Sequence, residues 1–185
     1  GIVGAHDNHI PLPMFKNATA LSSPGPRLRQ LGKDMSKFMR TGHIGEVHAL
    51  HELSARVSAA IKYSKGKTDT STTAEMSMEI GMGVCQDHVH AFIAVARCLD
   101  FSARYVSGYL LMCDAEIQDA SHAWAEVFTN GLGWVGFDIS NGISPDDRYV
   151  KLATGFDYAD AAPLSGIRFG SGEEQMSTQV RVSQQ

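Results

Sequence analysis

The sequence predicts an α+β domain in which helices come first along the chain and an antiparallel sheet follows. Before residue 100, apolar residues recur every three or four positions in three segments, which is the spacing of one helix face. After residue 100, three segments rich in β-branched and aromatic residues are separated by turn residues. With 185 residues, 43% of them hydrophobic, the chain is long enough for one compact domain with its own core.

The helical spacing places three helices. The first follows Pro26, has Leu28, Leu31 and Met35 on its apolar side, and ends at the breaker Gly42. The second is expected over residues 46–63, and a polar loop follows over residues 64–73. The third begins near Cys85, after a glycine-bearing loop, and runs to about residue 99.

Strands are expected at residues 103–112, 121–129 and 133–138. Asn130, Gly131 and Gly133 lie between the last two of these and predict a hairpin. A turn-rich stretch follows around residues 145–147, and alternation near the end of the chain favours one more strand at 176–182. Open loops are expected at 64–73 and 113–120, and the second is acidic.

Residues 1–25 are expected to form an irregular lead-in, because Pro11, Pro13 and Pro24, together with Pro26 at its border, prevent a continuous helix there. Residues 26–185 are expected to form the core domain. The chain begins at Gly1 without Met, which favours an excised fragment, and the lead-in is interpreted as the remnant of a preceding domain.

Charge and composition exclude several classes of protein. The net charge is −4 without long charged blocks, so no nucleic-acid partner is expected. No stretch has the roughly 20 apolar residues of a membrane span, so no membrane partner is expected. Three cysteines are an odd number and form no disulfide framework, which favours a reducing, cytoplasmic setting. The oligomeric state is left open.

Cys85 is the first candidate for chemistry. It lies at or near the N-terminus of the third predicted helix, where unpaired N–H groups and the positive end of the helix dipole favour an anion. A thiolate forms more readily in such a place and becomes a usable nucleophile. A thiolate enzyme also needs a base and a group that orients this base.

His122 and Asp138 can supply these two groups, because they fall on the two strands of the predicted hairpin. Side chains alternate along a strand, so His122 shares one face with Trp124 and Glu126, and Asp138 shares a face with Trp134. If the numbers of paired residues sum to 260, His122 lies opposite Asp138, with their Cβ atoms roughly 4.5–5.5 Å apart. A sum of 261 would separate them onto opposite faces. The sequence therefore predicts an even-sum register, or an equivalent bulge.

With these residues in place, the chain resembles the transglutaminase-like superfamily of papain-type thiol enzymes, in particular its bacterial members described as cysteine proteases. The resemblance covers about residues 10–183 and departs from the common pattern at Ile139, where the family more often has proline. Four motifs carry it, namely Gly81-Met82-Gly83-Val84-Cys85-Gln86-Asp87, Ala103-Arg104-Tyr105-Val106-Ser107-Gly108-Tyr109, Ser121-His122-Ala123-Trp124, and Gly133-Trp134-Val135-Gly136-Phe137-Asp138-Ile139-Ser140-Asn141-Gly142.

The resemblance implies a papain-like transglutaminase core, with Cys85 as nucleophile, His122 as general base and acid, and Asp138 as the residue that orients His122. An oxyanion would be bound by the backbone N–H of Cys85, with Tyr63, expected at the end of the second helix, or Gln86 as a possible second donor. The expected activity is amide-bond chemistry on a peptide or protein substrate through a thioester. Hydrolysis is favoured, and acyl transfer to an amine is the alternative.

Two alternatives of other classes stay open. A metal site could use Cys85, His88, His90 and His122, but neither C-x-x-C nor H-E-x-x-H spacing occurs, so no metal or cofactor is expected. A non-catalytic binding or scaffold module could keep the fold without the chemistry. Cys98, on the apolar side of its helix, and Cys113 are interpreted as structural. Two further histidine groups could be imagined as metal ligands, namely His43, His48 and His51, and His6 and His9, but His48 and His51 are interpreted as a solvated helix face.

Overall fold

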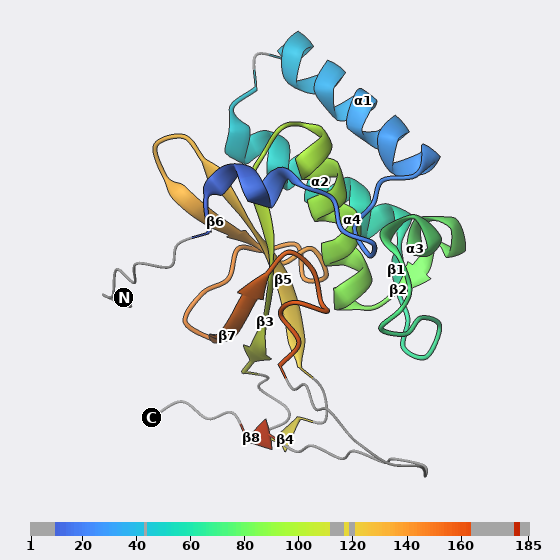
Figure 1. The fold of residues 1–185 in the computed structure, drawn as a ribbon, viewed down its shortest axis with the longest axis vertical. Helices are drawn as coiled ribbons and strands as arrows, with labels where there is room; N and C mark the ends of the chain where they lie inside the picture. Colours follow the sequence, from blue (N-terminus) through green and yellow to red (C-terminus); the bar gives the residue numbers. More distant parts are fainter. Residues whose placement is uncertain (1–9, 43, 112–116, 119–120, 164–179, 182–185) are drawn as a thin grey trace.

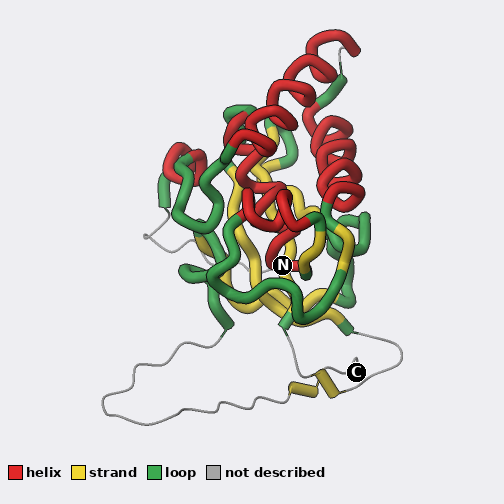
Figure 2. Tube along the Cα trace, turned by 90° about the vertical axis from the view of Figure 1, so that its right-hand side faces the viewer, coloured by secondary structure: helices red, strands yellow, loops and turns green. Residues whose placement is uncertain are grey.

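The computed structural model describes residues 10–42, 44–111, 117–118, 121–163 and 180–181. Its helices form one layer and its main antiparallel sheet forms the other, as the α+β prediction requires (Figure 1, Figure 2). In chain order the described elements are η1 (Leu12–Lys16), α1 (Pro26–Gly42), α2 (Glu46–Ala60), β1 (Lys62–Tyr63), α3 (Ala74–Ile80), β2 (Met82–Gly83), α4 (Cys85–Cys98), β3 (Ala103–Leu110), β4 (Ile117–Gln118), β5 (His122–Thr129), β6 (Gly133–Phe137), β7 (Tyr149–Gly155) and β8 (Val180–Arg181).

Helix α4 is the centre of the molecule. It packs against β3 and β5 on one side and against α1, α2 and α3 on the other (Figure 1). Its residues from Gln86 to Arg97 are all buried, so the helix that begins with Cys85 is held on every side. A helix fixed in this way is a rigid support for a functional group at its N-terminus.

The main sheet has the strand order β6-β5-β3-β7, and its neighbouring strands run antiparallel. Three of its strands confirm the predicted segments at 103–112, 121–129 and 133–138. The fourth, β7, lies in a part of the chain where the sequence predicted no strand. It pairs with β3 through a register shift between Ser107 and Gly108.

The hairpin of β5 and β6 has an even-sum register, but the predicted sum of 260 is wrong. The paired residues sum to 262, as in Ala125 with Phe137, and this pair is the last of the ladder. The shift comes from the loop, because Gly131 and Gly133 both adopt positive φ and close a three-residue connection after Thr129. Asp138 therefore lies just beyond the ladder, where it forms an isolated β-bridge with Ile143. In this register it is diagonal to His122 on the neighbouring strand.

The second helix ends at Ala60, so the expected helix over 46–63 is too long and Tyr63 does not end it. Ile61 is buried with extended backbone, and Lys62 and Tyr63 pair in parallel with Met82 and Gly83. Sheet pairing has therefore overridden helix propensity at this end. The predicted loop at 64–73 follows β1.

Helix α3 was not predicted, although its ends carry recognisable signals. The Thr73 hydroxyl accepts a hydrogen bond from the Met76 N–H, which is an N-cap, and Gly81 closes the helix with a φ of 70°. The segment has only seven residues, which is too short for a clear apolar repeat.

The lead-in is fastened to the core through the buried side chain of Arg97. Its guanidinium donates to the carbonyls of Phe15 and Phe156, to the Ser22 hydroxyl and to the Ala103 carbonyl. Arg97 therefore joins the start of the chain, the sheet and the segment after β7. The predicted domain limits at 25 and 26 stay predictions.

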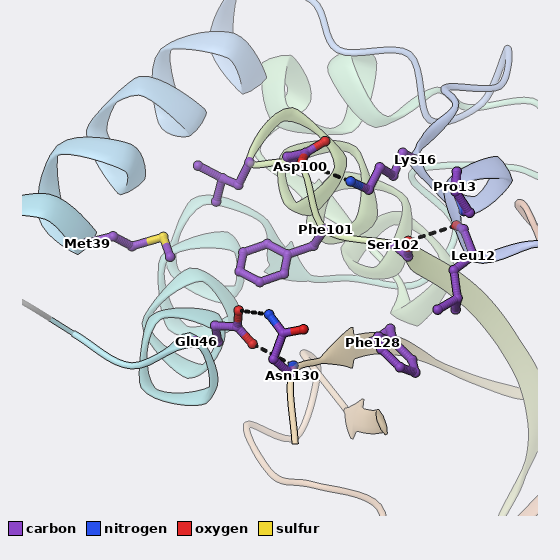
Figure 3. Close-up of a pocket in the computed structure, with 11 residues that line it drawn as sticks. Leu12, Pro13, Lys16, Met39, Glu46, Asp100, Phe101, Ser102, Phe128 and Asn130 are labelled. Carbon is purple, nitrogen blue, oxygen red and sulfur yellow. Dashed lines mark hydrogen bonds and ion pairs between the residues drawn. The ribbon is translucent and has the colours of Figure 1, made fainter. Parts of the chain in front are cut away.

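The far end of α4 borders a cavity of about 510 Å³ whose polar groups bond to one another (Figure 3). Lys16 pairs with Asp100, and the Asn130 backbone and side chain both donate to the carboxylate of Glu46. These contacts hold the lead-in and the hairpin loop against the helices. The 14 residues of α4 separate this cavity from Cys85 by about 20 Å.

The structure also bears on the predictions for Cys98 and for the loop at 113–120. Cys98 is exposed, so its placement on the apolar side of the helix is wrong, because the helix face that it occupies turns toward solvent at the last residue of α4. The expected open loop at 113–120 contains strand β4, which pairs with β8 inside the predicted strand 176–182. Cys113 and the acidic residues of that loop, Asp114, Glu116 and Asp119, lie outside the described residues. Within the described ranges, no helix is both long and apolar enough to cross a membrane.

Candidate active site

Cys85 is the first residue of α4, as the sequence predicted, and Val84 is its N-cap. Because the first N–H groups of a helix have no partner within the helix, the backbone around Cys85 offers free donors. The Asp87 carboxylate closes the helix start by accepting from the Val84 N–H at 2.7 Å, and it also accepts from the Thr68 hydroxyl at 2.7 Å. The thiol position is thus tied to the loop at 64–73.

His122 and Asp138 meet in spite of the shifted register. The Nε2 atom of His122 lies 2.6 Å from Oδ2 of Asp138, which is the distance of a strong, charge-assisted hydrogen bond. His122 is the first residue of β5, and Asp138 follows the last residue of β6. Both side chains lie on the sheet face predicted for them, and the diagonal placement supplies the contact.

Asp138 is fully buried and accepts hydrogen bonds from three further donors. The Asn141 amide and the Tyr149 hydroxyl each lie 2.7 Å from Oδ2, and the Asn141 backbone N–H lies 3.1 Å from Oδ1. Burial acts to raise the pKa of Asp138, but the hydrogen bonds from His122, Tyr149 and Asn141 outweigh it and hold the pKa below its usual value. Asp138 therefore stays an anion although it is buried.

The pKa of His122 is shifted upward, opposite to that of Asp138. Burial acts to lower its pKa, but the hydrogen bonds to Asp138 and Cys85, together with their charges, raise the pKa to about 9. Since Nε2 is used by Asp138, Nδ1 is the ring nitrogen left for Cys85. The Asp138 carboxylate and the Cys85 sulfur therefore both favour the protonated form of the His122 ring.

The ring of His122 packs against a cluster of aromatic side chains from β5 and β7. Trp124 stacks on it at 6.4 Å, and Tyr149 packs against the Trp124 indole at 5.4 Å. Gly108 makes this group possible, because a Cβ there would lie 2.0 Å from the Val150 carbonyl and 2.7 Å from the indole. The missing side chain at 108 lets β7 and Trp124 approach β3.

The two suggested oxyanion donors lie near the thiol but differ in their contacts. Burial, then the charges of Cys85 and Asp138, raise the pKa of Tyr63, which is on β1 with a half-exposed side chain. The Gln86 side-chain amide donates to the Asp69 carbonyl at 3.2 Å, so one of its two N–H bonds is already used. The roles of Tyr63 and Gln86 stay predictions.

Sequence reasoning missed Asn141 and Tyr149. Asn141 follows Asp138 by three residues in a turn that ends at Gly142, and a turn of this kind is a local signal that could have been used. Tyr149 had no such signal, because it reaches Asp138 only through the pairing of β7 with β3.

The histidines proposed as metal ligands make other contacts. His88 and His90 are buried and bond to different partners, and His48 and His51 are exposed on α2. Among the described residues, no three His, Cys, Asp or Glu side chains gather as a metal site. His6, His9 and His43 lie outside them.

Comparison with protein families gives a clear assignment. The model described as the transglutaminase-like superfamily matches residues 34–139, which is more than half of the chain and includes Cys85, His122 and Asp138. The chain belongs to this superfamily.

Similar sequences occur in mycobacteria. An uncharacterized protein of Mycobacterium leprae is 32% identical over 177 residues, covering 89% of this chain and 58% of the relative. An uncharacterized protein of Mycobacterium tuberculosis is 35% identical over 140 residues, covering 70% of this chain and 45% of the relative. The chain thus spans about half the length of these curated relatives.

Two solved structures have a similar fold. A "Putative Cysteine Protease" from Cytophaga hutchinsonii superposes with a TM-score of 0.69 and 26% identity, over 93% of this chain and 56% of that one. The periplasmic domain of TgpA from Pseudomonas aeruginosa superposes with a TM-score of 0.51 and 20% identity, over 69% and 46% of the two chains. The first likeness covers nearly the whole chain, and the second concerns the fold alone.

Proposed function

We propose that this protein is a thiol-dependent amidase or peptidase that uses Cys85, His122 and Asp138 as its catalytic residues. The superfamily and the Cytophaga hutchinsonii neighbour support a general function like that of cysteine proteases. One observation carries the finer proposal. Nε2 of His122 is held at 2.6 Å by the buried Asp138, and this leaves Nδ1 for Cys85.

In the proposed reaction, the Cys85 sulfur attacks the acyl carbon of the substrate as a thiolate, and its proton resides on His122. The tetrahedral oxyanion receives hydrogen bonds from free N–H groups at the start of α4. As the carbon–nitrogen bond breaks, His122 gives its proton to the leaving amine and a thioester remains on Cys85. Water then attacks the thioester, loses a proton to His122 and releases the carboxylic acid and the thiol.

The acceptor of the acyl group decides between two reactions. Water gives hydrolysis, which we favour, and an amine gives acyl transfer of the transglutaminase type. The first half of the reaction is the same for both, so the residues around Cys85 support either outcome. Substrate class and acceptor are therefore properties to be measured together.

A paired substitution tests the nucleophile. Cys85→Ala is expected to abolish turnover of a peptide library, with a cost to folding of about 1–2 kcal/mol because one sulfur at a helix end is lost. Cys98→Ala is the matched control, since Cys98 is the exposed thiol at the other end of the same helix, and it should keep parental activity. Full turnover by Cys85→Ala would remove Cys85 from the mechanism.

Product masses identify the acceptor. The library is incubated with and without a primary amine, and the products are separated by mass. Hydrolysis predicts the free acid in both mixtures, whereas acyl transfer predicts a product that carries the amine. If the protein is a scaffold without catalysis, neither product is expected. Iodoacetamide should then label all thiols equally slowly.

A further inference from the structure

His88 joins three parts of the site through one buried ring. It lies one helical turn after Cys85, on the same face of α4, and is 1% exposed. Its Nε2 lies 2.7 Å from the carbonyl oxygen of Ile61, and its Nδ1 lies 2.8 Å from the hydroxyl oxygen of Ser140. Neither nitrogen is left free.

These contacts fix the tautomer of the ring. A carbonyl oxygen can only accept, so Nε2 of His88 carries the hydrogen. Burial lowers the pKa of His88, so the ring is neutral and has only this one N–H. Nδ1 is then an acceptor, and the Ser140 hydroxyl donates to it. The hydrogen bonds run from Ser140 through His88 to Ile61.

Ser140 belongs to the turn that starts at Asp138. In this turn the Gly142 N–H donates to the Asp138 carbonyl at 2.8 Å, and the Asn141 N–H donates to Oδ1 of Asp138 at 3.1 Å. Within the described ranges, the bond between His88 and Ser140 is the hydrogen bond that links an α4 side chain to this turn. It connects the helix of the thiol directly to the segment of the carboxylate.

We propose that His88 and Ser140 are positioning residues that hold the Asp138 turn in place relative to Cys85. This inference rests on the proposed function, because it gives the pair a role in aligning the thiol, imidazole and carboxylate. Without this hydrogen bond, the described contacts between the turn and α4 are apolar packing alone, through the buried Ile139 and through Phe137 against Phe92, and such packing is less directional than a hydrogen bond. Catalytic groups need alignment within about 0.5 Å, and a misplacement of about 1 Å can cost about a hundredfold in rate.

The pH dependence of Cys85 alkylation tests the proposal without a known substrate. Iodoacetamide reacts with the thiolate, which the aligned His122 imidazolium stabilises. Ser140→Ala removes the donor, so the pH of half-maximal Cys85 alkylation should rise by about 0.5–1, the equivalent of one lost hydrogen bond. Ser140→Thr keeps the hydroxyl and should restore the parental profile. Ser140 is only half-buried, so both variants are expected to fold.

Two substitutions of His88 separate its contacts. An Asn amide reaches roughly where Nδ1 lies, and a Gln amide reaches roughly where Nε2 lies. His88→Asn can keep the bond to Ser140, whereas His88→Gln can keep only the bond to Ile61. Each variant loses one buried hydrogen bond and similar stability, but the alkylation profile should shift more in His88→Gln.

His90 supplies the matched control on the same helix. It is also buried, but its Nε2 accepts from the Tyr158 N–H at 3.2 Å and its ring packs against Tyr105 at 5.2 Å. His90→Gln should lower the melting temperature without moving the alkylation profile of Cys85. A purely structural role for His88 predicts the same behaviour for the His88 variants.

The outcomes distinguish the inference from the function on which it rests. If the parent labels Cys85 selectively and Ser140→Ala keeps the parental profile, the positioning role is overturned while the proposed function stands. If the parent shows no selective, pH-dependent labelling of Cys85, the proposed function fails and the inference fails with it. A shift in Ser140→Ala that Ser140→Thr reverses supports both.

Discussion

One carboxylate oxygen organises the candidate site at the scale of single residues. Oδ2 of Asp138 receives hydrogen bonds from His122 on β5, from Asn141 in the following turn and from Tyr149 on β7. These donors keep the carboxylate anionic although it is buried, and the anion in turn raises the pKa of His122. The charge state of the histidine is thus set by contacts among three separate segments.

Removing this charge while keeping its shape should inactivate the site. In Asp138→Asn the pKa of His122 should fall from about 9 toward its ordinary value, and turnover should drop by about 10²–10⁴-fold. An NMR titration of the His122 ring measures the first effect. Asp146→Asn is the control, because Asp146 is an exposed carboxylate that pairs with Arg148. Equal ring titrations in Asp138→Asn and in the parent would contradict this role for Asp138.

The three candidate catalytic residues could be proposed from the sequence because each lies in a local pattern. Cys85 precedes a helical repeat, and His122 and Asp138 lie on alternating strands beside a glycine turn. Tyr149, His88 and Ser140 could not be found in this way. Their contacts join segments distant in the chain, so no spacing in the sequence reports them.

The same contrast holds for whole elements. Helix α4 and strands β3 and β5 have long apolar repeats and were predicted within two residues at each end. Strand β7 was missed because two of its apolar residues, Val150 and Leu152, are exposed, and its place is set by pairing with β3. The hairpin register differed by two because two glycines with positive φ determined the loop. Short elements and registers depend on pairing and on turns more than on the period of apolar residues.

The approach of β7 to β3 depends on Gly108. Gly108→Ala should destabilise the protein by more than about 2 kcal/mol, because the new Cβ meets the Val150 carbonyl at 2.0 Å, and backbone cannot move as a flexible side chain does. Gly45→Ala is the control, since nothing lies within 4 Å of its Cβ and its φ is −65°, so the cost should stay below about 1 kcal/mol. Urea unfolding measures both. Equal costs would show that β7 does not need this close approach.

At the scale of the whole molecule, Arg97 ties the lead-in to the core. Arg97→Lys leaves several buried acceptors without donors, among them the carbonyls of Phe15 and Phe156, so unfolding should become easier by about 3–5 kcal/mol. Limited proteolysis should then cut first in residues 10–25. Arg56→Lys, which changes a partly exposed pair with Glu52 within one helix, should leave both measurements near parental values. A protease-resistant lead-in in Arg97→Lys would contradict this role.

The raised pKa of His122 also makes the stability of the whole domain depend on pH. A histidine with a pKa of about 9 in the folded state and about 6.5 when unfolded stabilises the fold fully below pH 6.5. This contribution, roughly 3 kcal/mol from the pKa difference and due first to the hydrogen bond with Asp138, is lost as pH rises through 9. In urea unfolding from pH 6 to pH 9.5, the stability difference between the parent and His122→Gln should shrink. A constant difference would refute the raised pKa.

The acyl-enzyme itself is the most direct measurement of the proposed chemistry. The protein is mixed with an activated peptide ester, quenched in acid within seconds and mapped by peptide mass. The account predicts one acyl group on Cys85, absent from Cys85→Ala and strongly reduced in His122→Gln. Acylation spread over other residues, or an unmodified Cys85 in a folded protein that turns over the ester, would contradict it.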